Sequence, residues 1–452
     1  MHNQNRAEYK KRLADPAVAA KLAAKAGQWN ALTQELASRR AASATAADPS
    51  SSACTANDSP GATLQLIDKL LTVNPDPSHL WNHRRELLLL PREEDSRATQ
   101  EVPVTSDDPD NDTKCTENST YFSLNDELKL TATCLQRNPK AYGAWFHRKW
   151  TVRHWLLQSA STTTEEQRSV TLQTELGLCA SFLDKDERNF HCWNYRRFVV
   201  AAMLELPVLA TSADDGNVPV ELLDGSWKVG GTVMGPQLAS KYATAHATTA
   251  SKQQPRPPAS ADEIVRSEFE YTAQRIEKNF SNCSAFHYRS KLIDLVLDAD
   301  MRDEGISRNE EGEAYQARLD MARGELETIQ SAVFTEPDDQ TAWWYHRFVV
   351  AWARPAPAAN WTDQDAAAEA IEMFSEVLEE EKESIQELVD AEGGQCKWGF
   401  LALHMLLSEL YKLDNFGTDE DRAANKKESN GCLDQLAVLD PDRATRYNSM
   451  RR

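Results

Sequence analysis

The stretch NPKAYGAWFHR, residues 138–148, contains the phrase that decides the fold. An Asn-Pro pair, which breaks a helix, is followed by Trp145 and, three positions later, by Arg148. Phrases in which an aromatic residue precedes an Arg by three positions recur along the chain. They are Trp81 with Arg84, Trp145 with Arg148, Trp193 with Arg196, Phe286 with Arg289, and Trp344 with Arg347. The chain is therefore a repeat protein.

Each repeat is predicted to be a pair of helices. Residues three apart share one face of a helix, so each phrase predicts a helix with the aromatic residue and the Arg on one side. Upstream of each phrase, apolar residues recur at helical spacing, as at Leu64, Ile67 and Leu71. A degenerate sixth pair is predicted from residues 396–401 and 433–439. The fold class is all-α, an elongated solenoid of helical hairpin repeats.

Composition divides the chain into segments. Residues 1–40 are predicted to form an N-terminal amphipathic helix, and residues 41–60, rich in Ala, Ser, Thr and Asp, a disordered linker. Residues 61–452 form the helical-repeat domain. Within it, two low-complexity insertions are predicted at about 91–119 and 207–260, because the spacing between repeats there exceeds what a helical pair needs.

Charge and cysteine usage exclude several functional classes. The formal net charge of the 452-residue chain is −20, which disfavours binding to nucleic acid or to an anionic membrane and favours basic partners. The sequence has no apolar run that could serve as a signal peptide or span a membrane, so we expect a cytoplasmic protein without stable membrane insertion. The Cys and His residues show no metal-ligand spacing, and no metal site contributed wholly by this chain is predicted.

The repeated residues are expected to be structural. The Trp side chains are predicted to wedge between helices in the core. The Arg side chains are predicted to pin neighbouring repeats together through a carboxylate or carbonyl group. A His or Tyr stands two positions after each aromatic residue and is predicted to form hydrogen bonds between repeats. These residues are His83, His147, Tyr195, Tyr288 and His346.

Lys140 differs from the other repeat residues. It follows Pro139 at the start of the Trp145 helix, where an ammonium group lies beside free backbone N–H groups and the positive end of the helix dipole. That combination suits an anion, and a solvated surface lysine is the alternative reading.

The phrases resemble the repeats of protein prenyltransferase alpha subunits. Within that family, the stretch DERNFHCWNYRRFV, residues 186–199, is most similar to the Rab-type, or type II, geranylgeranyltransferase group. The residues Asn279-Phe280-Ser281-Asn282 and the segment 339–347 are also similar to that group. Phe286 replaces the Trp of the fourth repeat, and the two insertions depart from the family pattern.

The resemblance implies a right-handed alpha-alpha superhelix, a crescent that wraps a separate prenyltransferase beta subunit. The heterodimer would transfer geranylgeranyl groups from geranylgeranyl diphosphate to C-terminal cysteines of Rab GTPases presented by a Rab escort protein. The resemblance places the catalytic zinc in the beta subunit, so this chain alone would bind no cofactor. It also assigns roles to three residues of this chain. Lys140 approaches the diphosphate as the catalytic residue, Tyr142 lies nearby, and His191 lies at the subunit interface, while Phe190 has no hydroxyl and is left out of the catalytic set.

Three alternatives stay open on the sequence. The chain could be the alpha subunit shared by farnesyltransferase and type I geranylgeranyltransferase, which act on CaaX boxes. It could be a non-enzymatic helical-repeat adaptor, although in tetratricopeptide arrays the Trp lies in the first helix of each pair. It could also be a relative that has lost activity, because activity requires a second chain.

Overall fold

The computed structural model describes the parts of the chain that form helices. The described residues are 15–45, 59–90, 120–158, 163–212, 261–307, 309–413 and 418–451. The insertion predicted at 91–119, most of the one at 207–260, and residues 46–58 of the predicted linker lie outside them. The chain divides into two compact units, Met1–Thr163 and Thr164–Arg452, and each is described by itself.

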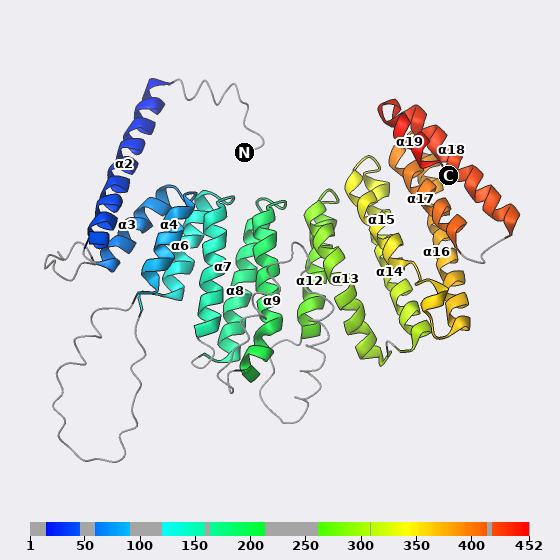
Figure 1. The fold of residues 1–452 in the computed structure, drawn as a ribbon. Helices are drawn as coiled ribbons and strands as arrows, with labels where there is room; N and C mark the ends of the chain where they lie inside the picture. The colour runs from blue at the N-terminus through cyan, green and yellow to red at the C-terminus, as the bar shows by residue number, and fades with distance from the viewer. Residues whose placement is uncertain are drawn as a thin grey trace, which may run out of the picture. The chain divides into compact units, whose positions relative to one another are not determined.

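The first unit contains two helical pairs preceded by a long helix (Figure 1). Helix α3 pairs with α4 and α6 pairs with α7, while α3 also contacts α6 and α4 contacts α7. First helices therefore pack on first helices and second helices on second helices. The preceding helix, α2, packs on α3 and includes the first residues of the predicted linker. The bounds are α2 Pro16–Thr45, α3 Pro60–Val73, α4 Ser78–Leu88, α6 Leu124–Arg137 and α7 Tyr142–Gln158.

The second unit is also built of helical pairs (Figure 1). Its pairs are α8 with α9, α12 with α13, α14 with α15, and α16 with α17, followed by α18 and α19. The bounds are α8 Glu165–Leu183, α9 Phe190–Ser212, α12 Ala261–Lys278, α13 Cys283–Glu304, α14 Glu311–Thr335, α15 Gln340–Ala353, α16 Gln364–Ala391, α17 Lys397–Lys412, α18 Asp419–Leu439 and α19 Ala444–Met450, with the short 3-10 helices η3 Ala358–Asn360 and η4 Pro441–Arg443.

The predicted all-α fold of helical hairpin repeats is confirmed. The sixth pair needs a correction. Helix α17 packs against α18, as the sequence indicated, but it also pairs with α16, a helix that the sequence analysis did not assign. The reason is that α16 lacks the aromatic phrase that marked the other repeats, although its apolar residues follow a helical stripe that includes Phe374, Leu378 and Ile385.

In the repeats that have a buried Trp, this residue closes the turn that precedes its helix. Its indole Nε1–H donates to the backbone carbonyl six residues earlier, at 2.8 Å from Trp81 to Pro75 and 2.7 Å from Trp193 to Glu187. Trp145 does the same to Pro139 at 2.8 Å. These side chains are buried, so the indole both fills the core and satisfies a turn carbonyl. The predicted structural role of Trp81, Trp145 and Trp193 is confirmed.

The fifth repeat has a different register from the one the sequence suggested. The buried Trp is Trp343, which donates to the carbonyl of Pro337 at 2.9 Å, whereas Trp344 is 70% exposed. The assignment of Trp344 and Arg347 to the structural repeat was therefore wrong. The position three after the buried Trp belongs to His346, which is 1% exposed, while Arg347 is exposed. The error arose because Trp343 and Trp344 each precede a basic residue by three positions.

Trp81 of the first repeat lies close against α7 of the second. The ring of Trp81 lies 4.7 Å from that of His147, centroid to centroid. A Cβ added at Gly143 would lie 2.5 Å from Cδ1 of Trp81 and 2.8 Å from its Nε1. Gly143 is therefore required for the close approach of the indole, whereas Gly177 in α8 has nothing within 4 Å of such a Cβ.

We predict that Gly143→Ala destabilises the first unit by about 1–3 kcal/mol, because the methyl group must displace a buried indole from its hydrogen bond. Gly177→Ala is the matched control, since it occupies open space in an exposed helix position, and it should be stabilising by about 0.5–1 kcal/mol. Equilibrium urea unfolding of both variants measures the difference. Equal stability of the two variants would contradict the close-approach argument.

Candidate functional site

Lys140 lies in the turn before α7. Its backbone N–H donates to Oδ1 of Asn138 at 3.1 Å, and Nδ2 of Asn138 donates to Oδ1 of Asp76 at 2.9 Å. The amide of Asn138 thus fixes the turn and ties it to the preceding repeat. The Lys140 residue is exposed. The turn presents the lysine to solvent two residues before the first residue of α7.

Aromatic side chains surround the start of α7. Tyr142 is 66% exposed, and its ring is stacked on that of Phe146 with 6.2 Å between centroids and 15° between planes. Phe146 is itself 49% exposed, and the guanidinium of Arg85 lies 5.1 Å from its ring centroid. Lys140, Tyr142, Phe146 and Arg85 therefore combine cationic and aromatic groups at one end of α7, a combination that suits a ligand with negative charge and an apolar part.

His191 lies at the start of α9 in the second unit. Its backbone N–H donates to Oδ1 of Asn189 at 3.2 Å, and the N–H of Cys192 donates to the same atom at 3.2 Å. Asn189 therefore caps the helix. The ring of His191 lies against that of Phe190, 3.9 Å between centroids, and Phe190 is 60% exposed.

Tyr142 and Phe190 occupy equivalent positions in their own repeats. Each is the first residue of a second helix and lies three residues before the buried Trp, since 145 − 142 and 193 − 190 are both 3. His191 follows one position later. Lys140 and Tyr142 lie in the first unit and His191 in the second, and each residue is exposed or partly exposed within its own unit.

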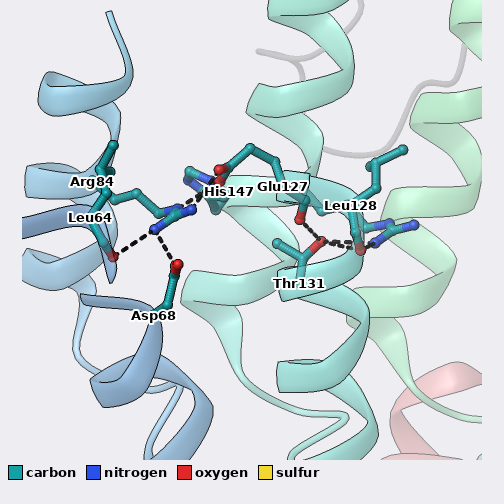
Figure 2. A network of polar contacts seen from close by, with 8 residues as sticks. Leu64, Asp68, Arg84, Glu127, Leu128, Thr131 and His147 are labelled. Carbon is teal, nitrogen blue, oxygen red and sulfur yellow. Dashed lines mark hydrogen bonds and ion pairs between the residues drawn. The ribbon is translucent and has the colours of Figure 1, made fainter. Parts of the chain in front are cut away.

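A buried ionic network joins α4, α6 and α7 (Figure 2). Nε of Arg84 donates to Oε2 of Glu127 at 2.7 Å, and Nη2 donates to Oε1 at 2.6 Å. Nε2 of His147 lies 2.8 Å from Oε2 of the same carboxylate. Arg84 also pairs with Asp68. Arg84 comes from the first repeat, and Glu127 and His147 come from the second, so one carboxylate joins two repeats.

The second unit repeats this arrangement. Arg196 holds Glu268 through bonds of 2.8 and 2.6 Å, and the hydroxyl of Tyr288 donates to that carboxylate at 3.2 Å. Arg289 holds Glu325 through bonds of 2.7 and 2.6 Å, and Tyr345 donates to Glu325 at 2.6 Å. The predicted pairing of these Arg residues with the next repeat is confirmed.

Arg148 makes the same bonds within its own repeat as Arg289 does. Nη1 of Arg148 donates to the carbonyl of Leu128 at 2.7 Å and to Oγ1 of Thr131 at 2.8 Å, and Nη1 of Arg289 donates to the carbonyl of Phe269 at 2.9 Å and to Oγ1 of Thr272 at 3.1 Å. In the fifth repeat, His346 stands where the other repeats have Arg, and its Nε2 lies 3.1 Å from Oε1 of Glu381 in α16. The ring two positions after the buried Trp343 is Tyr345, so the earlier placement of His346 at that position is corrected.

The sequence analysis missed the glutamates. All but Glu381 precede the ring of their own repeat by 20 residues, as Glu127 does His147, Glu175 does Tyr195 and Glu268 does Tyr288. All five side chains, those of Glu127, Glu175, Glu268, Glu325 and Glu381, are buried on otherwise apolar stripes. A charged residue recurring at a fixed distance on a buried stripe was the signal that could have found them.

The network fixes the protonation of its members. Burial alone would raise the pKa of Glu127, but hydrogen bonds from His147 and Arg84 outweigh it and hold that pKa below its ordinary value. Burial lowers the pKa of His147 to about 4, against a partial opposing effect of Glu127. His147 is thus neutral at pH 7, and because a carboxylate only accepts, its Nε2 carries the proton. Burial raises the pKa of Tyr288 and Tyr345, which stay protonated and donate.

The described part of the chain contains neither a cluster of metal ligands nor a membrane-spanning helix. Within it, no group of three or more His, Cys, Asp or Glu side chains is arranged to bind a metal ion. Among the same residues, no helix combines the length and the apolarity needed to cross a bilayer.

A known family of repeat proteins matches the sequence of these helical pairs. The protein prenyltransferase alpha subunit repeat matches in five segments, residues 62–90, 124–155, 172–203, 265–296 and 322–353. The chain belongs to the protein prenyltransferase alpha-subunit family. The matched segments also give the register of the fifth repeat, because Trp343 lies as far from the start of its segment as Trp193 does, 343 − 322 = 193 − 172.

Similar curated proteins share one name, geranylgeranyl transferase type-2 subunit alpha. The protein of Schizosaccharomyces pombe is 30% identical over 190 residues, which cover 42% of this chain and 50% of the relative. The human protein is 30% identical over 299 residues, 66% of this chain and 35% of the relative. The Candida albicans protein is 26% identical over 391 residues, 84% and 82% of the two chains. The chain thus spans half of the fission yeast relative and about a third of the human one.

We predict that Arg196→Ala destabilises the second unit by about 3–5 kcal/mol, because it leaves Glu268 buried without its cation. The control is Arg266→Ala. Arg266 pairs with Asp300 at 2.9 Å on the surface, with its side chain 35% exposed, and its loss should cost at most about 1 kcal/mol. Chemical denaturation of the full chain compares the two variants, and similar costs would show that the buried pair is dispensable.

We predict that the first unit loses stability as pH falls from 6.5 toward 4. His147 has a lower pKa in the folded state than its ordinary 6.5, so in this window the unfolded chain binds more protons and acid favours unfolding. The shift corresponds to about 3 kcal/mol once pH is below both values. Hydrogen-exchange protection factors of α6 and α7, corrected for the intrinsic rate, measure this loss.

His147→Tyr tests the assignment, because Tyr occupies the equivalent position at Tyr195 and Tyr288 and does not titrate in this range. The variant should keep α6 and α7 protected to lower pH than the parent. An unchanged pH profile would exclude His147 as its origin.

Proposed function

We propose that this chain is the alpha subunit of a type II protein geranylgeranyltransferase. With a beta subunit it would transfer geranylgeranyl groups from geranylgeranyl diphosphate to C-terminal cysteines of Rab GTPases, which a Rab escort protein presents. The observation that carries the proposal is the match of five prenyltransferase alpha subunit repeats, together with relatives that share the type-2 alpha name. The start of α7, where Lys140 and Tyr142 are exposed, supports it.

Lys140 is proposed to act on the leaving group. When a cysteine thiolate attacks the first carbon of the lipid, the bond to the diphosphate breaks and negative charge develops on the diphosphate. An ammonium group held at that point stabilises the transition state more than the ground state. The turn fixed by Asn138 positions the Lys140 backbone beforehand. The Tyr142 hydroxyl is proposed to donate a hydrogen bond nearby, and His191 to contact the beta subunit.

The remaining parts of the machinery are assigned to the partner. We place the catalytic zinc in the beta subunit, where it would supply the cysteine of the Rab tail as a thiolate. The contribution of this chain is then to hold the diphosphate and to bind the beta subunit through the exposed starts of α7 and α9. We place the complex in the cytoplasm.

The experiment that tests the function is co-expression with the type II beta subunit encoded in the same genome, followed by a geranylgeranyl transfer assay. The substrates are a Rab ending in two cysteines, with and without escort protein, and a CaaX peptide. Escort-dependent labelling of the Rab alone is expected. Labelling of the CaaX peptide without escort would assign the chain to the farnesyl and type I group, and failure to form a heterodimer would favour an adaptor.

We predict that Lys140→Ala lowers kcat by tens to hundreds of fold, equivalent to about 2–3 kcal/mol, because a charge-assisted contact made in the transition state is lost. Heterodimer formation, measured by gel filtration, should be unchanged, since the other proposed contacts at the starts of α7 and α9 remain. Lys129→Ala on α6 is the control, because Lys129 is an exposed lysine of the same unit. A Lys140→Ala complex with full turnover would remove this residue from the catalytic set.

A further inference from the structure

A cavity of about 780 Å³ opens in the second unit between α15, α17 and α19. Its walls come from the fifth repeat and from the helices that follow the sixth pair. None of the residues proposed for prenyl transfer lines it. The cavity therefore requires an explanation of its own.

Large apolar side chains line the cavity. Trp344, Trp398, Met405 and Met450 are among its lining residues. Trp344 is 70% exposed, because the register of α15 buries Trp343 and turns its neighbour outward. A tryptophan with that exposure leaves a large apolar surface in water, and Trp is among the residues that contribute most to binding energy at protein interfaces.

Positive charge accompanies this apolar surface. The lining residues include five basic side chains and one acidic one, in a chain whose net charge is −20. The basic residues are Arg347, Arg354, Lys412, Arg443 and Arg446. The acidic residue, Glu409, pairs with both Arg354 and Lys412.

The remaining three cations differ in their partners. Arg443 pairs with Asp440 at 2.7 Å. In the part of the chain that the structure describes, Arg347 and Arg446 have no ion pair with a carboxylate. The charge of the cavity therefore has the opposite sign to the charge of the molecule as a whole, and it is concentrated beside exposed aromatic surface.

The walls are held in place by contacts outside the cavity. Tyr447 of α19 packs against Leu433 and Leu436 of α18, and its hydroxyl donates to Asp440 at 3.0 Å. On the opposite wall, Nε1 of Trp398 donates to the carbonyl of Asp338 at 3.2 Å. Because these contacts form the cavity in advance, a ligand would bind without the cost of ordering it.

We propose that this cavity, the C-terminal groove, binds an acidic segment of a partner protein that carries large apolar side chains. The apolar side chains would cover Trp344 and the methionines, and the carboxylates would pair with Arg347 and Arg446. An inorganic anion would leave the tryptophan exposed, and a neutral lipid would leave the arginines uncompensated. An acidic and apolar polypeptide satisfies both requirements. The inference does not depend on the prenyl transfer reaction.

The test is fluorescence anisotropy with the full chain and a labelled short peptide of Glu, Leu and Phe, beside a second peptide with Lys in place of Glu. The acidic peptide should bind, more weakly as salt is raised, and the basic peptide should not. Trp344→Ala should weaken binding by about tenfold or more. Arg347→Glu and Arg446→Glu should each weaken it by about three- to tenfold.

Lys427→Glu is the matched control, because it makes the same charge change at an exposed position of α18 that does not line the cavity, and it should bind the peptide as the parent does. Circular dichroism confirms that each variant is folded. Equal binding of the acidic and basic peptides, or equal loss in Lys427→Glu, overturns the proposal. The groove would instead bind a second copy of this chain if neither peptide binds and the chain self-associates in a way that Trp344→Ala abolishes. Sedimentation velocity measures that self-association, and this outcome also overturns the proposal.

Discussion

A buried carboxylate shared between consecutive repeats is the interaction on which this structure depends. Glu127 receives Arg84 from the repeat before it and His147 from its own, and Glu268 and Glu325 are held in the same way in the second unit. Burying such a charge is unfavourable unless its hydrogen bonds are complete, so the carboxylate is stable only when two repeats are correctly aligned. The network therefore specifies register as well as contributing to stability, whereas the apolar helix faces alone would tolerate more than one alignment.

The proposed functional residues depend on this support because they lie on the same helices. Helix α7 has its inner face fixed by Trp145, His147 and Arg148, which leaves Tyr142 and Phe146 on the outside. The inner residues determine the rotation of the helix about its axis, and that rotation determines which side chains reach a partner. A rigid inner face is a suitable base for a site, since a contact to a developing charge loses its effect when its position is uncertain.

Much of the fold could be predicted from the sequence, because the aromatic phrase and the helix-breaking turns are local signals. The pairing of Arg196 and Arg289 with the next repeat also followed from residue chemistry. The glutamates were missed because a single Glu on an apolar stripe has no local mark, and its partners lie 20 to 72 residues away. The fifth repeat was misread because Trp343 and Trp344 both fit a three-residue spacing. Pro337, six residues before Trp343 just as Pro75 is before Trp81, could have decided it.

The site was predictable to a smaller extent. The exposure of Lys140 and Tyr142 agrees with the prediction that they lie at the start of a helix. Their roles rest on the resemblance, because a binding site shared with a second chain leaves no complete pattern in this sequence. The C-terminal groove had no signal in the sequence. Its residues come from several separate helices, and Trp344 and Arg347 were first assigned to the structural repeat, so only their exposure in the structure shows that they face solvent.

The shared carboxylate also gives the array two different ends. Twenty residues before His83, where the later repeats have Glu, the first pair has Thr63, and it cannot receive an arginine from a preceding repeat. In the last pair, Leu401 and Ala402 stand 20 and 21 residues after Glu381, where the earlier repeats have the ring and the cation. Neither the first nor the last pair therefore has an unpaired partner for the same carboxylate contact. In the part of the chain that the structure describes, this contact stops at the first and the last pair, so it would not by itself join one array to another head to tail.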